Sequence, residues 1–180
     1  PPAPAVPAAE ALSRRQAGNG RFANSKMSGG KPVAARRAET AQGQHPFAIV
    51  VACADSRTAP EIVFDQGIGD LFVIRTAGNL VDDYALGSIE YAAEHFHSPL
   101  LLVLGHEKCG AVEATIDSIQ NPGTIPGKIG TIVDAITPAV KQMQGQPGDL
   151  VDNVLRANAL HCVEQLGNAD PFVSPMQADG

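Results

Sequence analysis

Three short apolar runs constrain the fold of this chain more than any other feature of its sequence. FAIVVACA (47–54), LFVIRT (71–76) and LLLVLG (100–105) are continuous in apolar character rather than alternating. Strands of this kind are buried on both faces, as in parallel sheets that are covered by helices. The stretch 82–97 has apolar residues at helical spacing, so it forms a right-handed βαβ crossover with the strands on either side. We therefore predict an α/β fold with a central, mainly parallel β-sheet flanked by helices.

The rest of the chain is predicted to surround this sheet in a single domain. A length of 180 residues is enough for one sizeable hydrophobic core. Residues 1–7 are rich in Pro and Ala and are predicted to form a disordered arm, whereas residues 8–180 form the α/β domain. Residues 25–45 are polar and are predicted to run over the surface. Further helices are predicted at 8–24, 109–119, 131–144 and 149–166.

Composition argues against several classes of function. The formal net charge is −6 and the sequence pI is near 5.2, whereas a nucleic-acid-binding protein is expected to be basic. The longest apolar runs have the length of strands, so we predict no insertion into a membrane. Three cysteines are too few, and odd in number, for a disulfide framework. Free or metal-bound thiols are therefore the better interpretation.

Polar residues with metal-binding chemistry follow the first and third apolar runs. The first run ends with Cys53, Asp55 and Arg57, and the third is followed by His106 and Cys109. Because ligands bind at the carboxyl ends of strands in open α/β sheets, these residues are expected to meet at one rim. Two thiolates, one imidazole and one carboxylate suit tetrahedral zinc, whereas soft sulfur disfavours magnesium and calcium. The sequence therefore predicts a zinc site at this rim.

Asp55 has two alternative roles in such a site. It can bind zinc and close the site, or it can pair with Arg57 and leave a fourth position for water. Each of the two motifs is weak alone, because a cysteine at the end of a strand is often only a small buried hydrophobe. Their joint occurrence after two apolar strands is a much stronger signal. A purely structural zinc site needs no arginine beside its aspartate, so the pattern favours a catalytic site.

Several segments together resemble the β-class carbonic anhydrases. They are CADSR (53–57), PEIVFDQGIGDLFVIRTAGN (60–79), GSIEYAAEHFHSPLLLVLGHEKCGAV (87–112) and NVLRANALHCVEQL (153–166). GNGRF (18–22) resembles the N-terminal helix signature of that family. The resemblance implies that an N-terminal helical arm packs on a dimer partner.

The resemblance also assigns roles to individual residues. It implies that Cys53, His106 and Cys109 bind zinc, with Asp55 as a switchable fourth ligand and Arg57 as the partner of Asp55. It implies a small apolar carbon dioxide pocket at the dimer interface, completed by the second subunit. The residues at the pocket positions are Gln44, Phe72, Ala77, Tyr91 and Gly110.

The activity that the resemblance implies is carbonic anhydrase (carbonate dehydratase), a zinc-dependent lyase. Carbon dioxide is reversibly hydrated to bicarbonate and a proton, by attack of hydroxide that is bound to zinc. Two alternatives stay open: hydrolysis of carbonyl sulfide or carbon disulfide on the same scaffold, and a non-catalytic zinc or redox module.

The resemblance to this family also carries expectations for the oligomeric state and the cellular location of the protein. The family ordinarily continues past SPMQADG (174–180) into a C-terminal edge strand, whereas this sequence stops at Gly180, so either the protein is truncated or it lacks that strand. The resemblance thus implies a homodimer, and leaves open a tetramer built through that sheet edge. The Pro/Ala-rich start and the GHEKCGAV (105–112) form of the motif are similar to bacterial members with export signals. They favour a periplasmic or secreted location over a cytoplasmic one.

Overall fold

A parallel β-sheet forms the centre of the molecule in the computed structural model, which describes residues 6–28 and 32–169. Within these residues the sheet has three strands in the order β2-β1-β3, and both pairings are parallel. The strands are β1 (Ala48–Cys53), β2 (Leu71–Thr76) and β3 (Leu101–Leu104). Every residue of β1 is buried, as expected for a central strand that is covered on both faces. The predicted α/β fold is therefore confirmed.

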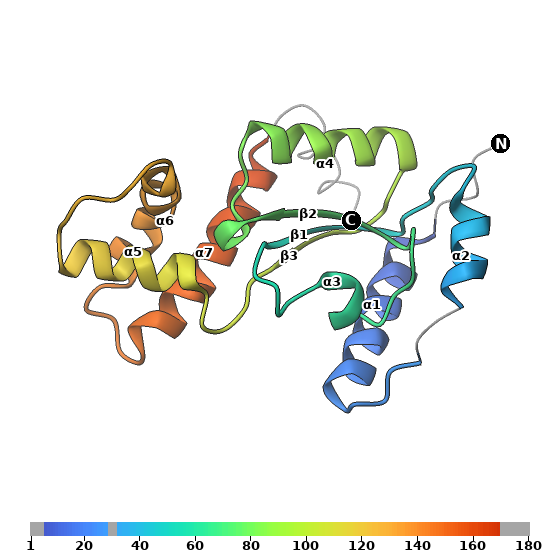
Figure 1. Ribbon diagram of the computed structural model, residues 1–180, viewed down its shortest axis with the longest axis horizontal. Coiled ribbons are helices and arrows are strands. Elements are labelled where there is room, and N and C mark those ends of the chain that lie inside the picture. Colours follow the sequence, from blue (N-terminus) through green and yellow to red (C-terminus); the bar gives the residue numbers. More distant parts are fainter. Residues whose placement is uncertain (1–5, 29–31, 170–180) are drawn as a thin grey trace.

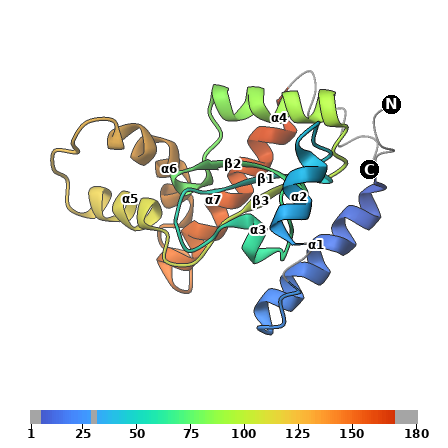
Figure 2. The ribbon, with the colours of Figure 1, turned by 45° about the vertical axis from the view of Figure 1, so that its right-hand side comes forward.

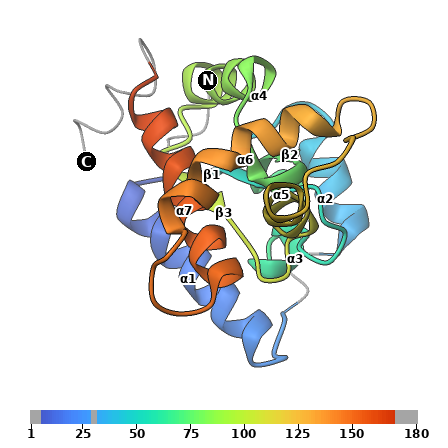
Figure 3. The same ribbon diagram turned by 90° about the vertical axis from the view of Figure 1, so that its left-hand side faces the viewer.

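Helices cover both faces of the sheet and the carboxyl ends of its strands (Figure 1). They are α1 (Ala8–Ala23), α2 (Val33–Thr40), α3 (Pro60–Val63), α4 (Asp83–Phe96), α5 (Gly110–Gln120), α6 (Ile129–Met143) and α7 (Leu150–Gly167). Helix α4 lies along one face of the sheet, while α1 and α3 lie on the other side. Helices α5 and α6 lie beyond the carboxyl ends of the strands, and α7 runs from them back along β3, so that its Leu166 joins the cluster of Ile49 and Val51; the three helices face the viewer in Figure 3.

Alternate residues of β1 supply two of the three hydrophobic clusters. Ile49 and Val51 pack against Ile89 of α4, whereas Val50 and Ala52 lie in a second cluster with Phe64. This division follows from the pleat, which sends successive side chains to opposite faces. The third cluster joins Cys53 and Cys109 to apolar residues of α5, α6 and α7. The carboxyl end of β1 therefore lies against a helical core.

Helix α1 is fastened to the α3 region of its own chain (Figure 2). Gly18 lies so close to this region that an added Cβ would be 1.7 Å from the carbonyl oxygen of Phe64. The Arg21 guanidinium pairs with the buried carboxylate of Asp65, and Asn19 Nδ2 donates to the carbonyl of Val63 at 3.2 Å. The GNGRF segment thus works here as a contact surface within the chain.

Some predictions concern parts of the chain outside the described residues. Residues 1–5 of the predicted arm and the C-terminal stretch 170–180 are among them. None of the helices in the described part of the chain combines the length and the apolar character that a membrane span requires.

Candidate metal centre

Three side chains that the sequence predicts as metal ligands lie together at the carboxyl ends of β1 and β3. Cys53 is the last residue of β1, His106 follows β3, and Cys109 is the N-cap residue of α5. Their ligand atoms all lie within 4.8 Å of one another, and the two sulfur atoms are 3.9 Å apart. Both cysteines are buried and neither forms a disulfide. Two sulfurs and one imidazole nitrogen at this spacing make a donor set suited to zinc.

The hydrogen bonding of His106 leaves one ring nitrogen free for a metal. Nδ1 lies 2.8 Å from the carbonyl oxygen of Glu107, which can only accept a hydrogen bond. Nδ1 must therefore carry the proton, so the lone pair is on Nε2. Nε2 is buried and has no hydrogen-bond partner among the described residues. An orphaned acceptor that faces two buried thiols fits a metal ligand.

The two thiols differ strongly in acidity because they share one proton. The pKa of Cys53 is lowered to about 4, first because Cys109 donates a hydrogen bond to its thiolate. The pKa of Cys109 is raised, first by that same bond and then by burial. A divalent ion favours ionisation of both sulfurs, since its charge outweighs the cost of a second buried anion.

A main-chain group also contributes to the environment of Cys53. The N–H of Gly78 donates to the Cys53 sulfur over 3.3 Å. Gly78 lies in the short 3-10 turn η1 (Ala77–Asn79), with a φ of 72° that favours glycine. A Cβ at this position would also approach Ile136 to 2.9 Å. Only glycine therefore fits the turn that aims this N–H at the sulfur.

Asp55 is paired with Arg57 rather than grouped with the three ligands. Arg57 Nε lies 2.9 Å from Oδ1 of Asp55, and Nη2 lies 2.7 Å from Oδ2. The main-chain N–H of Arg57 donates to Oδ1 as well, at 2.9 Å. These bonds hold the pKa of the Asp55 carboxyl well below its usual range. This pairing with Arg57 is the contact expected in the second of the two roles considered for Asp55.

Two arginines tie the site loops together, and one of them was not identified from the sequence. Arg57 Nη2 donates to the carbonyl of Lys108 at 2.9 Å, which joins the loop after β1 to the residue before Cys109. Arg75 donates through Nε to the carbonyl of Cys53 at 2.9 Å, and through Nη2 to the carbonyl of Asp55. The sequence does contain one signal for Arg75, because it is the only charged residue in the strand-forming run LFVIRT.

The predicted carbon dioxide pocket is not assembled within one chain. Ala77 lies in η1 and Gly110 is the first residue of α5, so both adjoin the metal-binding group. Gln44 is exposed before β1, and Phe72 lies near the start of β2, at the amino end of the sheet. Tyr91 is on α4 and is 48% exposed. Gln44, Phe72 and Tyr91 thus lie away from the metal-binding group of their own chain.

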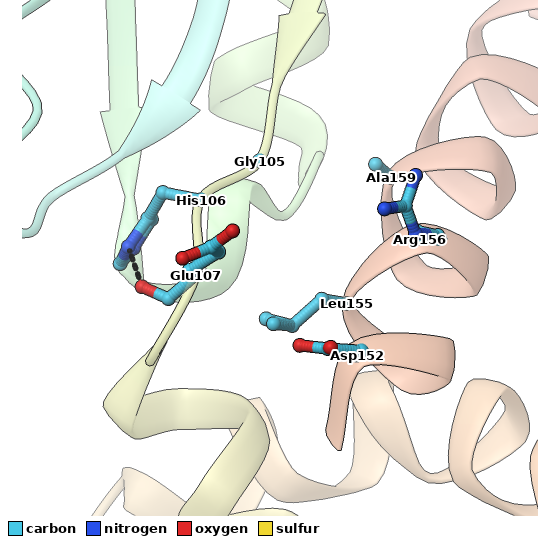
Figure 4. Close-up of a pocket in the computed structure, with 7 residues that line it drawn as sticks. All are labelled: Gly105, His106, Glu107, Asp152, Leu155, Arg156 and Ala159. Atoms are coloured by element: carbon cyan, nitrogen blue, oxygen red, sulfur yellow. Dashed lines mark hydrogen bonds between the residues drawn. The ribbon is translucent and has the colours of Figure 1, made fainter. Parts of the chain in front are cut away.

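A cavity of about 290 Å³ lies between the His106 segment and α7 (Figure 4). Its lining consists of Gly105, His106, Glu107, Asp152, Leu155, Arg156 and Ala159. The side chains of Glu107, Asp152 and Leu155 extend into the space between the two segments. None of the predicted pocket residues lines this cavity.

Comparison with known proteins shows a similarity that covers most of the chain. The family model for carbonic anhydrase matches residues 48–180. Carbonic anhydrase 2 of Mycobacterium tuberculosis is 48% identical over 124 residues, which are 68% of this chain and 59% of that protein. A carbonic anhydrase of Mycolicibacterium smegmatis is 46% identical over 123 residues, 68% of this chain and 60% of that protein. The chain thus spans less than two thirds of the length of these curated relatives.

Solved structures share the fold. The β-carbonic anhydrase of Coccomyxa, determined with acetazolamide, has a TM-score of 0.70 and 25% identity, and the match covers 94% of this chain and 77% of that one. A tetrameric β-carbonic anhydrase of Sordaria macrospora also has a TM-score of 0.70, with 21% identity over 94% of this chain and 87% of that one.

Proposed function

This chain belongs to the β-class of the carbonic anhydrase family, and on that premise we propose that it catalyses the reversible hydration of carbon dioxide to bicarbonate and a proton. The observation that carries the proposal is the group of Cys53, His106 and Cys109 with the Asp55–Arg57 pair beside it. A structural metal site has no need of such a pair, whereas hydration of carbon dioxide needs a group that orients water.

We propose zinc as the metal of this site. Cys53 and Cys109 would bind it through sulfur, and His106 through Nε2, which has no other partner among the described residues. When bound, zinc supplies a Lewis acid that makes water nucleophilic near neutral pH. Protein ligands of this number leave one tetrahedral position open for chemistry.

The Asp55 carboxylate is the group that orients the attacking water. Its Oδ1 accepts two hydrogen bonds from Arg57, whereas Oδ2 accepts one within the described part of the chain, from Nη2. A carboxylate oxygen has two lone-pair positions, so Oδ2 keeps one for a hydrogen bond from water. Because its pKa is lowered, the carboxyl stays ionised and accepts this bond across the neutral range. Arg57 fixes the orientation of the acceptor.

We further propose that the carbon dioxide pocket is completed in a homodimer. Gln44, Phe72 and Tyr91 lie away from the metal-binding group of their own chain. A twofold arrangement that brings the amino end of one sheet to the carboxyl end of the other would supply them in pairs. Sedimentation or light scattering of the active protein tests this assembly, and a fully active monomer would contradict it.

Zinc analysis combined with stopped-flow hydration of carbon dioxide, on the same sample, tests the function. Cys109→Ser should lose zinc and activity together, because the hard hydroxyl is a poor substitute for thiolate. Ser98→Ala is the control for the loss of a buried polar group away from the ligands, since Ser98 Oγ donates to the carbonyl of Pro46 at the amino end of the sheet, and it should retain zinc. Zinc-loaded protein that hydrolyses carbonyl sulfide or carbon disulfide, but does not hydrate carbon dioxide, would refute the proposal.

A further inference from the structure

Helix α7 reaches the metal centre through a buried amide. We propose that Asn158 is a positioning residue, which holds the η1 turn so that the N–H of Gly78 stays directed at the sulfur of Cys53. The inference rests on the metal-binding part of the proposed function. It adds a residue that touches neither metal nor substrate and that lies on a helix far from the ligand motifs in sequence.

The chain of contacts is short and buried throughout. Asn158 is 2% exposed, and its Nδ2 donates to the carbonyl oxygen of Gly78 at 2.9 Å. The N–H of the same glycine donates to Cys53 at 3.3 Å. Because the carbonyl only accepts, the nitrogen of the amide must face Gly78, so this orientation of the side chain is determined. A single residue, Gly78, therefore links Asn158 to a metal ligand.

The amide oxygen of Asn158 indicates that this residue does more than fill space in the core. Its Oδ1 is buried and has no hydrogen-bond partner among the described residues. A buried acceptor without a partner lowers the stability of the fold. The neighbouring inward positions Val154 and Ala157 are apolar, as a helix that only packs on a core requires. The hydrogen bond to Gly78 is the favourable contact that offsets this cost.

Helix α7 holds two successive residues of the η1 turn, because Asn158 contacts Gly78 and Cys162 is hydrogen-bonded to both the side chain and the carbonyl of Asn79. Of these two contacts, only that of Asn158 acts on Gly78 itself. The only regular structure of this segment is the three-residue 3-10 turn, and Gly78 has a φ of 72° within it. Glycine is free to leave that conformation at little steric cost, and the N–H would then point away from the sulfur. Groups that orient a metal ligand in this manner typically change metal affinity about 10–100-fold when they are removed.

Zinc affinity, measured by competition with a chromophoric chelator, tests the inference. Asn158→Ala removes the donor, and Asn158→Leu removes it while keeping the volume of the side chain. Both variants should bind zinc about 10–100-fold more weakly than the unaltered chain. The leucine variant decides the matter if the alanine variant does not fold. Wild-type affinity in the folded leucine variant would overturn the proposal.

Ser98→Ala is a matched control for the loss of a buried hydrogen bond. Ser98 is 1% exposed and its Oγ donates to the carbonyl of Pro46 at 2.6 Å, at the amino end of the sheet and away from the ligands. This variant should lower the unfolding temperature of the metal-free and the zinc-loaded protein equally. The Asn158 variants should instead reduce the rise in unfolding temperature that zinc produces, because that rise follows the affinity of the folded state. An unchanged rise would show that Asn158 has a structural role only.

Cobalt substitution gives a spectroscopic reading of the same contact. The sulfur-to-cobalt charge-transfer band should shift in the Asn158 variants and stay in place in Ser98→Ala, because only the former alter the hydrogen bond on Cys53. None of these readings depends on turnover. Unaltered protein that binds zinc without hydrating carbon dioxide would refute the proposed function alone, whereas Asn158 variants with unaltered affinity and spectrum would refute this inference alone.

Discussion

The pairing of Arg57 with Asp55 is the most direct point at which to perturb the chemistry without removing the metal. Arg57→Ala should leave the zinc content near that of the unaltered protein, because the guanidinium contacts none of the three ligand side chains. It should nevertheless lower the rate of carbon dioxide hydration, since the Asp55 carboxylate loses the contacts that orient it. In this variant the zinc content should therefore stay unchanged while the rate of carbon dioxide hydration falls.

The size of the loss follows from the hydrogen bonds that remain. The Asp55 carboxylate accepts three bonds from Arg57, and two of them come from the guanidinium. The third comes from the main-chain N–H and survives the substitution. Complete loss of a positioned acid or base typically costs about 10²–10⁴ in rate. A carboxylate that keeps one of its anchors should lose less, on the order of 10–100-fold.

Two further substitutions at these positions calibrate the effect. Arg57→Lys keeps the positive charge but cannot contact both carboxylate oxygens in a planar fork, so its rate should fall between those of the alanine variant and the unaltered protein. Asp55→Asn keeps the shape of the side chain but weakens the acceptor, and it should be the slowest of the three.

Stopped-flow hydration over roughly pH 6.5–9, the range around the pKa of water at a zinc site, is the assay. Rates are normalised to zinc content, because Arg57 also donates to the carbonyl of Lys108 next to Cys109. Arg37→Ala, on an exposed part of α2, is the control for loss of an arginine and should retain the full rate. If Arg57→Ala hydrates carbon dioxide at the unaltered rate across this range, Arg57 is only a structural partner and the reasoning is wrong.

Two other predictions concern the attachment of α1. Gly18→Ala should lower the unfolding temperature, because the added Cβ would lie 1.7 Å from the carbonyl oxygen of Phe64, whereas Gly20→Ala has nothing within 4 Å of its Cβ and should be neutral or stabilising in the same thermal scan. The pKa of Asp65 is lowered to about 2 from 3.8, first by the main-chain N–H of Ser28 and then by Arg21, so the contribution of Asp65 to stability is present above about pH 4 and is lost as the pH falls toward 2. Urea unfolding of the metal-free protein between these pH values should show a weaker pH dependence for Asp65→Asn, and an unchanged dependence would contradict the assignment.

The sheet and the metal-binding group were predictable from the sequence for the same reason. Continuous apolar runs identify strands that are buried on both faces, and β2 has the predicted bounds, while β1 and β3 are each one residue shorter at either end. Parallel pairing then puts the carboxyl ends of β1 and β3 at one rim, which brings Cys53 to His106 without any further information. The helix at 82–97 was predictable because its apolar residues recur at helical spacing, and α4 extends over Asp83–Phe96.

Features that depend on contacts between distant segments were not predictable in this way. Helix α2 lies in the polar stretch for which only a surface course was expected, and the arginine at its centre, Arg36, is held by Asp70 and the carbonyl of Ile68. Asn158 reads as an ordinary polar residue of a helix until its bond to Gly78, across 80 positions of sequence, is seen. Arg75 is similar, because its partners are main-chain carbonyls of the neighbouring strand and loop, which carry no signal in the side-chain pattern.

The location of the sulfur ligands links the metal to the stability of one particular part of the fold. Cys53 and Cys109 belong to the hydrophobic cluster that also contains Ile136 of α6 and Val154 of α7. A second thiolate in such surroundings is unfavourable unless a cation neutralises it, because burial and the hydrogen bond to Cys53 both raise the pKa of Cys109. A metal held by Cys53 and Cys109 would join the end of β1 to the start of α5, whereas none of the three ligands lies in the α1–α3 region. Metal affinity and the local stability of α5–α7 should consequently change together, so substitutions that loosen those helices are expected to weaken metal binding even where they touch no ligand.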